Sequence, residues 1–365
     1  MDNFIKNKIN IYDPVATNII IIAIFILIAV IFLRKEKYSS PLSLPQTVQI
    51  RGAAIIFIVL GHLWTHVSSV QIWQNFAGSS VNTFLFISGY GIASSFYKQR
   101  LDSFSFFYKR IKKVMIPYWI ATFIFITLDF IILGDTLKLK DLILTLSGIN
   151  INSATQNFDY VRWYITFQLF WYLAFMITFY RFSSKIAINL IFILAFFLFF
   201  SDYYLLNFGW SQFFAFPLGC FFAAYKDDLL SVSKSYPSLL KIGFVLIACH
   251  ILVRYAFYNN YISLPSIALK MIYEVNSFIW TSSLILIVAL WGDHGYTSHF
   301  LNFIGKYSYE IYLLHGPFLI KYNFIFFITR DFEIPIALTF LIFIFFILSA
   351  SFCFNKINNY VFSYE

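Results

Sequence analysis

The segment Arg51-Gly-Ala-Ala-Ile-Ile-Phe-Ile-Val-Leu-Gly-His62 places two ionisable side chains at the ends of an otherwise apolar run. The run predicts a membrane-spanning helix. At about 100° and 1.5 Å per residue, Arg51 and His62 share one face, roughly 16 Å apart along the axis. An ionisable pair on one stripe of such a helix is costly in lipid, so this face should turn toward protein or a water-filled cavity. We therefore take the pair as the first candidate for a functional site.

The composition of the 365-residue chain is that of a membrane protein, with 60% hydrophobic and 12% charged residues. The mean hydropathy of +0.75 lies outside the soluble globular class. The net charge of +9 does not imply nucleic acid, because basic residues in a polytopic membrane protein first of all set topology. Cys220, Cys249 and Cys353 lie far apart in apolar runs, without the paired spacing of a metal site. His62 and His66 are four residues apart and could share a metal, but no third ligand has suitable spacing. We expect no bound metal.

Apolar windows of about 17 to 25 residues, the length that crosses roughly 30 Å of hydrocarbon, can be placed eleven times along the chain. Their approximate spans are 17–33, 50–70, 81–97, 114–133, 162–180, 186–201, 208–225, 240–258, 272–291, 308–328 and 334–353. Because backbone polar groups in lipid must be satisfied internally, these segments have to be helices. The predicted fold is an all-α, polytopic integral membrane helical bundle of about 10–11 transmembrane helices.

The first apolar run is followed by Arg34-Lys35-Glu36-Lys37 and lacks a small-residue cleavage pattern, so we interpret it as a retained anchor rather than a signal peptide. With the N-terminus outside, 16 of the 26 Lys and Arg residues fall on inward-facing segments and 9 on outward-facing ones, with Arg51 uncounted at a helix entrance. The positive-inside rule therefore predicts an external N-terminus and a cytoplasmic C-terminus.

Several further motifs follow the first one in a fixed order. They are Phe84-Leu-Phe-Ile-Ser-Gly-Tyr90, Arg110-Ile-Lys-Lys113 before Pro117-Tyr118-Trp119, Trp163-Tyr164 with Gln168 and Tyr172, Phe216-Pro-Leu-Gly219, and Tyr307-Ser-Tyr-Glu-Ile-Tyr-Leu-Leu-His315. Together with Arg51-Gly-Ala-Ala and His62, this ordered set resembles the acyltransferase 3 family over roughly residues 46–355. The members of that family are bacterial integral-membrane O-acyltransferases that modify cell-surface glycans and some other hydroxyl compounds.

The resemblance implies ten core helices, so that the apolar span at 17–33 is an additional one. The expected organisation is an extra N-terminal helix and cytoplasmic linker at 1–45, an acyltransferase membrane domain at 46–355 and a short cytoplasmic tail at 356–365. The resemblance also implies a cytoplasmic acyl-CoA donor, an acceptor often reached from the outer side, and a multi-pass location in the bacterial cytoplasmic (inner) membrane.

His62 is the expected catalytic base, since an imidazole can take a proton from an acceptor hydroxyl near neutral pH. His315 enters from the same inner face, roughly 12 Å deep, so the two rings are expected to converge in one cavity. One would then serve as the base and the other as a donor to the thioester oxygen. The alternatives are a helix-packing His62 and a structural His315 beside Gly316-Pro317.

The expected donor site is basic. Arg51, Arg110 and Lys113 would hold the phosphates of coenzyme A, with Lys113 standing where the family more often has Arg. A role of these charges in topology alone is the alternative. Ser88 would line the path of the pantetheine arm; an acyl-carrying Ser88 is the less favoured interpretation, because no adjacent base is visible in the sequence.

On the acceptor side we assign Trp163, Tyr164 and Glu310, although an ordinary aromatic belt explains the first two equally well. The predicted function is transfer of an acyl group, acetyl above all, from acetyl-CoA to a hydroxyl of a cell-surface polysaccharide or its lipid-linked precursor. The expected partners are acyl-CoA, this glycan or lipid-linked sugar, and the bilayer. The intramembrane carboxylates Asp129, Glu274 and Glu310 keep open a carrier or flippase for a lipid-linked saccharide, and a purely structural membrane subunit is a third possibility.

Overall fold

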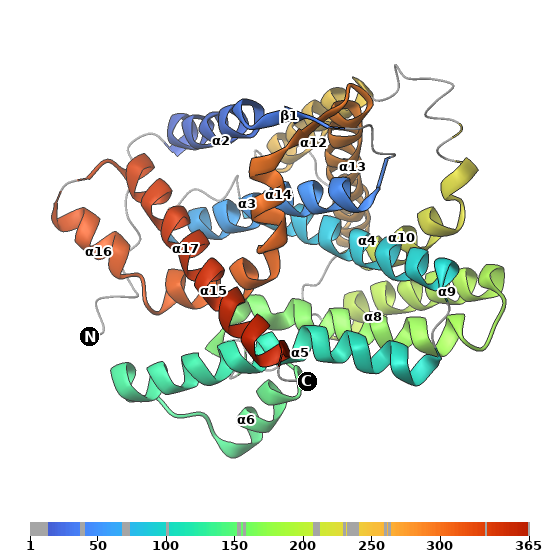
Figure 1. Ribbon diagram of the computed structural model, residues 1–365, viewed down its shortest axis with the longest axis horizontal. Helices are drawn as coiled ribbons and strands as arrows, with labels where there is room; N and C mark the ends of the chain where they lie inside the picture. Colours follow the sequence, from blue (N-terminus) through green and yellow to red (C-terminus); the bar gives the residue numbers. More distant parts are fainter. Residues whose placement is uncertain are drawn as a thin grey trace.

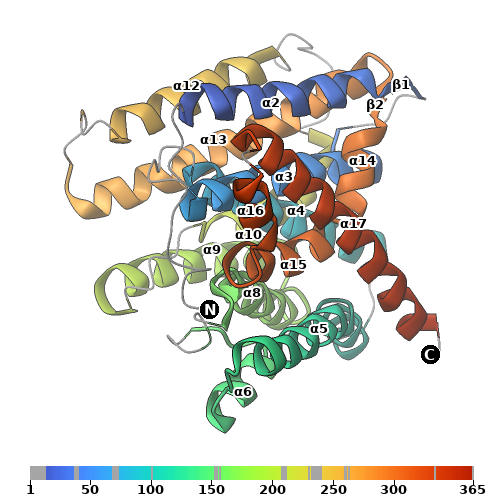
Figure 2. The same ribbon diagram turned by 90° about the vertical axis from the view of Figure 1, so that its left-hand side faces the viewer.

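The computed structural model describes residues 14–36, 41–67, 74–99, 102–151, 155, 158–206, 212–228, 231, 241–258, 261, 264–332 and 334–363. Most of these residues are helical, which confirms the all-α, polytopic class. In both views α2 and α12 lie along one edge of the molecule and α5 and α6 along the opposite edge (Figures 1 and 2), with α3, α4 and α15 between them.

Each predicted span overlaps one main helix. These helices are α2 (Pro14–Ile31), α3 (Leu44–Val67), α4 (Gln74–Lys98), α5 (Ser103–Leu128), α8 (Trp163–Phe179), α9 (Ser184–Ser201), α10 (Ala215–Ala224), α12 (Ile242–Tyr258), α13 (Ser266–Asp293), α15 (Ser308–Ile320) and α17 (Ile336–Ser363). Shorter elements are η1 (Asp129–Leu133), α6 (Leu139–Leu146), η2 (Tyr160–Arg162), η3 (Asp202–Leu206), α14 (His299–Lys306) and α16 (Phe324–Asp331). Within the described residues, five stretches are long and apolar enough to cross a membrane, and they fall on α3, α5, α9, α13 and α17.

The tenth predicted span was wrong as one continuous helix. α15 ends at Ile320, and the chain turns before α16 begins. The N–H groups of Lys321 and Tyr322 both donate to the Pro317 carbonyl, and their side chains both donate to the Asp129 carboxylate at the end of α5, each at 2.6 Å. This polar turn, held by a residue distant in sequence, interrupts the apolar run.

The basic segment 98–113, which lies between the predicted spans 81–97 and 114–133, is largely the first part of α5. Asp102 caps this helix by accepting a hydrogen bond from the Ser105 N–H at 2.9 Å. Hydrogen bonds from the Ser105 hydroxyl and N–H hold the pKa of the exposed Asp102 carboxyl below its ordinary value. Arg110 and Lys113 therefore project from a regular helix, three residues apart on one face.

Two of the sequence motifs meet where α4 crosses α10. A methyl group on Gly89 would lie 2.2 Å from the Phe216 carbonyl oxygen, and one on Gly219 would lie 2.1 Å from the Phe86 carbonyl oxygen. Side chains at these positions would hold the two backbones apart, so the crossing needs glycine on both helices. The Ser88-Gly89 pair thus faces another helix through its glycine, which leaves the serine to act elsewhere.

The ends of α2 and α13 are joined at one end of the bundle. The short strands β1 (Leu33–Lys35) and β2 (Tyr296–Ser298) pair in antiparallel register, with Leu33 opposite Ser298. The Ser298 N–H also donates to Gln49 Oε1 of α3 at 2.7 Å. Segments 33–35 and 296–298, which the charge distribution assigns to one side of the membrane, therefore lie together, next to the beginning of the helix that carries Arg51.

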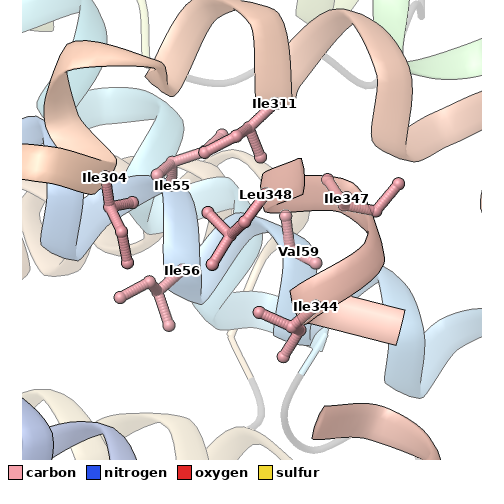
Figure 3. A pocket seen from close by; sticks show the side chains of 8 residues that line it. All are labelled: Ile55, Ile56, Val59, Ile304, Ile311, Ile344, Ile347 and Leu348. Carbon is pink, nitrogen blue, oxygen red and sulfur yellow. The ribbon is translucent and has the colours of Figure 1, made fainter. Parts of the chain in front are cut away.

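A small apolar cavity lies beside α3 (Figure 3), with a volume of about 20 Å³. It is lined by Ile55, Ile56, Val59, Ile304, Ile311, Ile344, Ile347 and Leu348. These side chains offer no polar group, and the space is about that of one water molecule. This face of α3 is therefore a packing surface against α14, α15 and α17, and the candidate site lies elsewhere.

Candidate active site

A hydrogen-bonded pair of histidines links α3 to α15. His62 Nδ1 lies 2.8 Å from His315 Nε2, and the two ring planes are within 2° of parallel. His315 is fully buried, whereas His62 is partly exposed. Two residues separated by 253 positions in the sequence are thus brought into direct contact.

The partners of His315 determine the direction of this hydrogen bond. His315 Nδ1 lies 3.0 Å from the Ile311 carbonyl oxygen and 2.9 Å from that of Tyr312. Because carbonyl oxygens only accept, Nδ1 carries the proton, and Nε2 of the neutral ring accepts from His62 Nδ1–H. The neutral form of His62 then has its lone pair on Nε2. This tautomer is the one required of a general base that is oriented by a second group.

A short segment between α6 and α8 covers the histidine pair. The Tyr160 ring meets the His62 ring edge to face, with a centroid separation of 5.3 Å. The Tyr312 hydroxyl of α15 donates to the Val161 carbonyl at 2.5 Å. These contacts hold η2 against both histidine-bearing helices, so the site is closed on this side by the chain that leads into α8.

The same segment contains a buried ion pair that the sequence analysis did not identify. Arg162 Nε donates to Asp159 Oδ2 at 2.8 Å, and both side chains are fully inaccessible to solvent. The Arg162 guanidinium also donates to Thr122 Oγ1 of α5 at 2.5 Å and lies 5.0 Å above the Tyr118 ring. Arg162 is one of the nine basic residues that the topology prediction assigns to outward-facing segments, and no role in the site was predicted for it. The available signal was the spacing of Asp159 and Arg162, an acid and a base three residues apart.

Arg51 lies near a cluster of polar side chains that we call the Ser88 cluster, formed by Ser88, Gln168 and Tyr172. Ser88 Oγ lies 3.2 Å from the Tyr172 hydroxyl and accepts from Gln168 Nε2 at 3.3 Å, and Gln168 also donates to Tyr172. Arg51 acts electrostatically on Tyr172 and Tyr164, and its Nε has no hydrogen-bond partner among the described residues. Motifs from α3, α4 and α8 are therefore brought into one neighbourhood.

A basic cavity of about 260 Å³ lies between α4, α5 and the end of α8. It is lined by Ser95, Phe96, Gln99, Phe106, Lys109, Arg110, Lys113 and Tyr180. Arg51 of α3 and Glu310 of α15 both act electrostatically on Lys113, so this cavity adjoins the helices that carry the histidine pair. Lys109, for which no role in the site was predicted, lines the cavity together with the expected Arg110 and Lys113.

The remaining predicted residues are Trp163, Tyr164 and Glu310, of which Tyr164 contacts α15, the helix of His315, and Glu310 belongs to it. The Tyr164 ring meets Tyr312 edge to face at 5.3 Å, and Trp163 packs on Tyr164 at 6.5 Å. Glu310 is buried and accepts a hydrogen bond from Asn355 Nδ2 of α17 at 2.6 Å. Tyr164 therefore adjoins the helix of His315, whereas Glu310 is held at the beginning of that helix, on the side of Lys113.

A family model described as an acyltransferase domain matches residues 49–355, most of the chain. The protein belongs to this acyltransferase 3 family. The matched region of this membrane acyltransferase contains both histidines, the Asp159–Arg162 ion pair and the basic cavity. No curated protein matches the sequence, and no solved structure matches it either.

Proposed function

We propose that this membrane acyltransferase moves an acetyl group from cytoplasmic acetyl-CoA to a sugar hydroxyl of a cell-surface polysaccharide or its lipid-linked precursor. The observation that carries the proposal is the hydrogen bond between His62 and His315, in which a fully buried imidazole orients a partly exposed one. Such an arrangement suits proton transfer from a hydroxyl group that enters the site from a hydrated path.

In the proposed reaction, His62 Nε2 takes the proton of the acceptor hydroxyl while its oxygen attacks the thioester carbonyl carbon. The tetrahedral intermediate then collapses by breaking the carbon–sulfur bond. The leaving thiolate of coenzyme A recovers the proton from the His62 imidazolium, which yields the ester and the free thiol. His315 holds His62 in the required tautomer throughout by accepting its Nδ1–H. Transfer is direct, and no acyl-enzyme is needed.

The donor is expected to bind from the basic cavity. Arg110, Lys109 and Lys113 would contact the phosphates of coenzyme A, where Arg110 supplies the planar fork that suits phosphate oxygens. The pantetheine arm would pass the Ser88 cluster toward His62. Arg51, whose Nε has no partner among the described residues, would donate to the donor phosphates.

The acceptor is proposed to approach from the opposite side, along Trp163 and Tyr164 at the beginning of α8. This direction agrees with the predicted topology, in which the loop before α8 is external and the loop before α5 is cytoplasmic. The site of action would then be the bacterial cytoplasmic membrane, with the N-terminus outside and the C-terminus inside.

The competing carrier hypothesis rests on carboxylates within apolar helices, and each of these has a partner in the structure. Asp129 binds Lys321 and Tyr322, Glu310 binds Asn355, and Glu274 accepts from the Phe213 N–H at 3.0 Å. The contacts of Asp129 and Glu310 favour a structural role over proton coupling, whereas Oε2 of the buried Glu274 has no hydrogen-bond partner among the described residues. These contacts support the acyltransferase proposal over a proton-coupled carrier.

The test uses purified protein in lipid nanodiscs, incubated with acetyl-CoA and an envelope glycan extract. We expect release of coenzyme A thiol together with an O-acetyl signal in the NMR spectrum of the glycan, and loss of both in His62→Ala. Cells without the gene should likewise lack glycan O-acetyl groups. Normal acetylation by folded His62→Ala would remove the histidine from the reaction, and transport of a saccharide without thiol release would favour the carrier.

A further inference from the structure

A buried carboxylate lies next to the histidine pair. The Asp159 side chain is fully buried, and its Oδ1 lies 2.7 Å from the position that a methyl group on Gly316 would occupy. Gly316 directly follows His315. Only a residue without a side chain allows a carboxylate to come this close to the backbone of α15 at that position. The glycine in the sequence Leu-His-Gly-Pro thus makes room for a charge beside the catalytic pair.

The position of this carboxylate is determined by donors from η2. Oδ2 accepts from Arg162 Nε at 2.8 Å, while Oδ1, the oxygen that meets Gly316, accepts from the Val161 N–H at 3.3 Å. Arg162 is in turn anchored by Thr122 and by the rings of Tyr118 and Phe158. One oxygen is therefore held by the arginine, and the other is presented toward the helix of His315.

The charged and titratable groups around the pair are few within the described part of the chain. Asp159 and Arg162 face it from the η2 segment, together with Tyr160, whose ring lies against His62. Tyr312 lies on the helix of His315 itself, and Arg51 lies on the helix of His62, roughly 16 Å away along the axis. Among the charged groups of the described residues, only Asp159 acts electrostatically on His315.

We propose that Asp159 is a positioning residue whose negative charge stabilises the imidazolium formed on the His62 and His315 pair during acyl transfer, with Arg162 holding the carboxylate in place. The inference rests on the proposed function. Asp159 takes no proton: the proton moves from the acceptor hydroxyl to His62 and then to the coenzyme A thiolate. While His62 carries it, the positive charge is shared through the 2.8 Å hydrogen bond with His315, beside the anion.

The test compares Asp159→Asn, the double variant Asp159→Asn/Arg162→Gln and the matched control Asp202→Asn. Asp202 is also buried and ion-paired, to Lys270 at 2.5 Å, but it belongs to η3 on another part of the molecule. We expect Asp159→Asn to lower kcat at least about tenfold, the effect of removing one opposite charge from an ionising group, with little change in KM for acetyl-CoA. Asp202→Asn should retain the native kcat.

The double variant separates an electrostatic role from a structural one, because it leaves no unpaired buried arginine. We expect it to fold like the native protein, as judged by a single symmetric peak in size-exclusion chromatography, and to stay as slow as Asp159→Asn. Recovery of the native kcat in the double variant would overturn the inference and leave the ion pair with a purely structural role.

A second measurement does not depend on the acyl acceptor. Diethyl pyrocarbonate reacts with a histidine in its neutral form and not as imidazolium, so at mildly acidic pH both variants of Asp159 should react faster at His62 than the native protein does, as measured by mass spectrometry. An unchanged rate would also overturn the inference. If the native protein transfers no acetyl group but the rate of His62 modification still rises on substitution of Asp159, the charge coupling holds and the proposed acetyl transfer fails. If native protein transfers acetyl and Asp159→Asn is as active as Asp202→Asn, only the role of Asp159 fails.

Discussion

The hydrogen bond between His62 and His315 leads to a quantitative prediction about replacing each ring. His62→Ala removes the proposed base, and general base catalysis contributes about 10²- to 10⁴-fold to the rate. His315→Phe keeps a buried ring but removes the acceptor of the 2.8 Å bond. That bond becomes charge-assisted when His62 is protonated, and such a bond contributes about 1.5–3 kcal/mol, or roughly 10- to 150-fold in kcat.

The combination of the two changes is the decisive variant. If His315 acts only through His62, then His62→Ala/His315→Phe should be no slower than His62→Ala, because the two rings work as one unit. The assay is thiol release from acetyl-CoA under single-turnover conditions, with protein in nanodiscs. His250→Phe is the matched control, since His250 is another fully buried histidine, and its Nδ1 donates to the Asn276 carbonyl of a different helix pair. It should retain the native kcat.

Multiplicative losses would refute this reasoning. They would mean that His315 stabilises the reaction independently of His62, as a donor to the thioester oxygen would. That alternative requires His315 Nε2 to carry a proton, whereas the two carbonyl partners at Nδ1 place the proton of the neutral ring on the other nitrogen.

Three further results are expected. Arg110→Ala should raise KM for acetyl-CoA roughly tenfold with a smaller effect on kcat, because a hydrogen bond to a charged group contributes about 1.5 kcal/mol or more. As a control, Lys98→Ala at an exposed position of α4 should leave KM unchanged. Equal KM values in the two variants would remove Arg110 from the donor site. Gly89→Ala should lower the stability by roughly 1–3 kcal/mol, because the added methyl group meets the α10 backbone. The measurement is the unfolding temperature, which should be lower than that of Gly91→Ala, where the added methyl group meets nothing within 4 Å. Ser88→Ala should lower kcat about tenfold or less, since the two hydrogen bonds that it removes, with Tyr172 and Gln168, are both neutral. Complete inactivity, or an acetylated Ser88 in the native protein, would instead indicate an acyl-enzyme.

The positions of the main helices could be predicted from the sequence because hydropathy over about 20 residues is a local property. The tenth span shows the limit of this reasoning. Lys321 and Tyr322 lie within a run that is apolar enough to be continuous, and the turn there depends on the carboxylate of Asp129 from another helix. The beginning of α5 was misjudged for a related reason: a run of charges resembles a loop, whereas the Asp102 cap makes it helical.

The site was partly accessible from the sequence as well. Counting turns from the expected inner interface placed His62 and His315 at comparable depths, and the structure brings their rings into contact. The ion pair of Asp159 and Arg162 was missed because an arginine at the first position of a predicted span has the same local pattern whether it faces water or protein. Its burial is decided by Thr122 and Tyr118 of α5, which no local pattern connects to residue 162.

The sequence by itself determined that this protein is a membrane-embedded helical bundle, and its ordered motifs pointed to the acyltransferase family, because apolar run length and motif order are properties of the chain alone. Only the tertiary structure decided which nitrogen of each histidine carries the proton, and that a carboxylate lies beside them. Both depend on atoms brought together from distant helices, since hydrogen-bond direction and electrostatic coupling act through space over a few ångströms and follow no sequence separation.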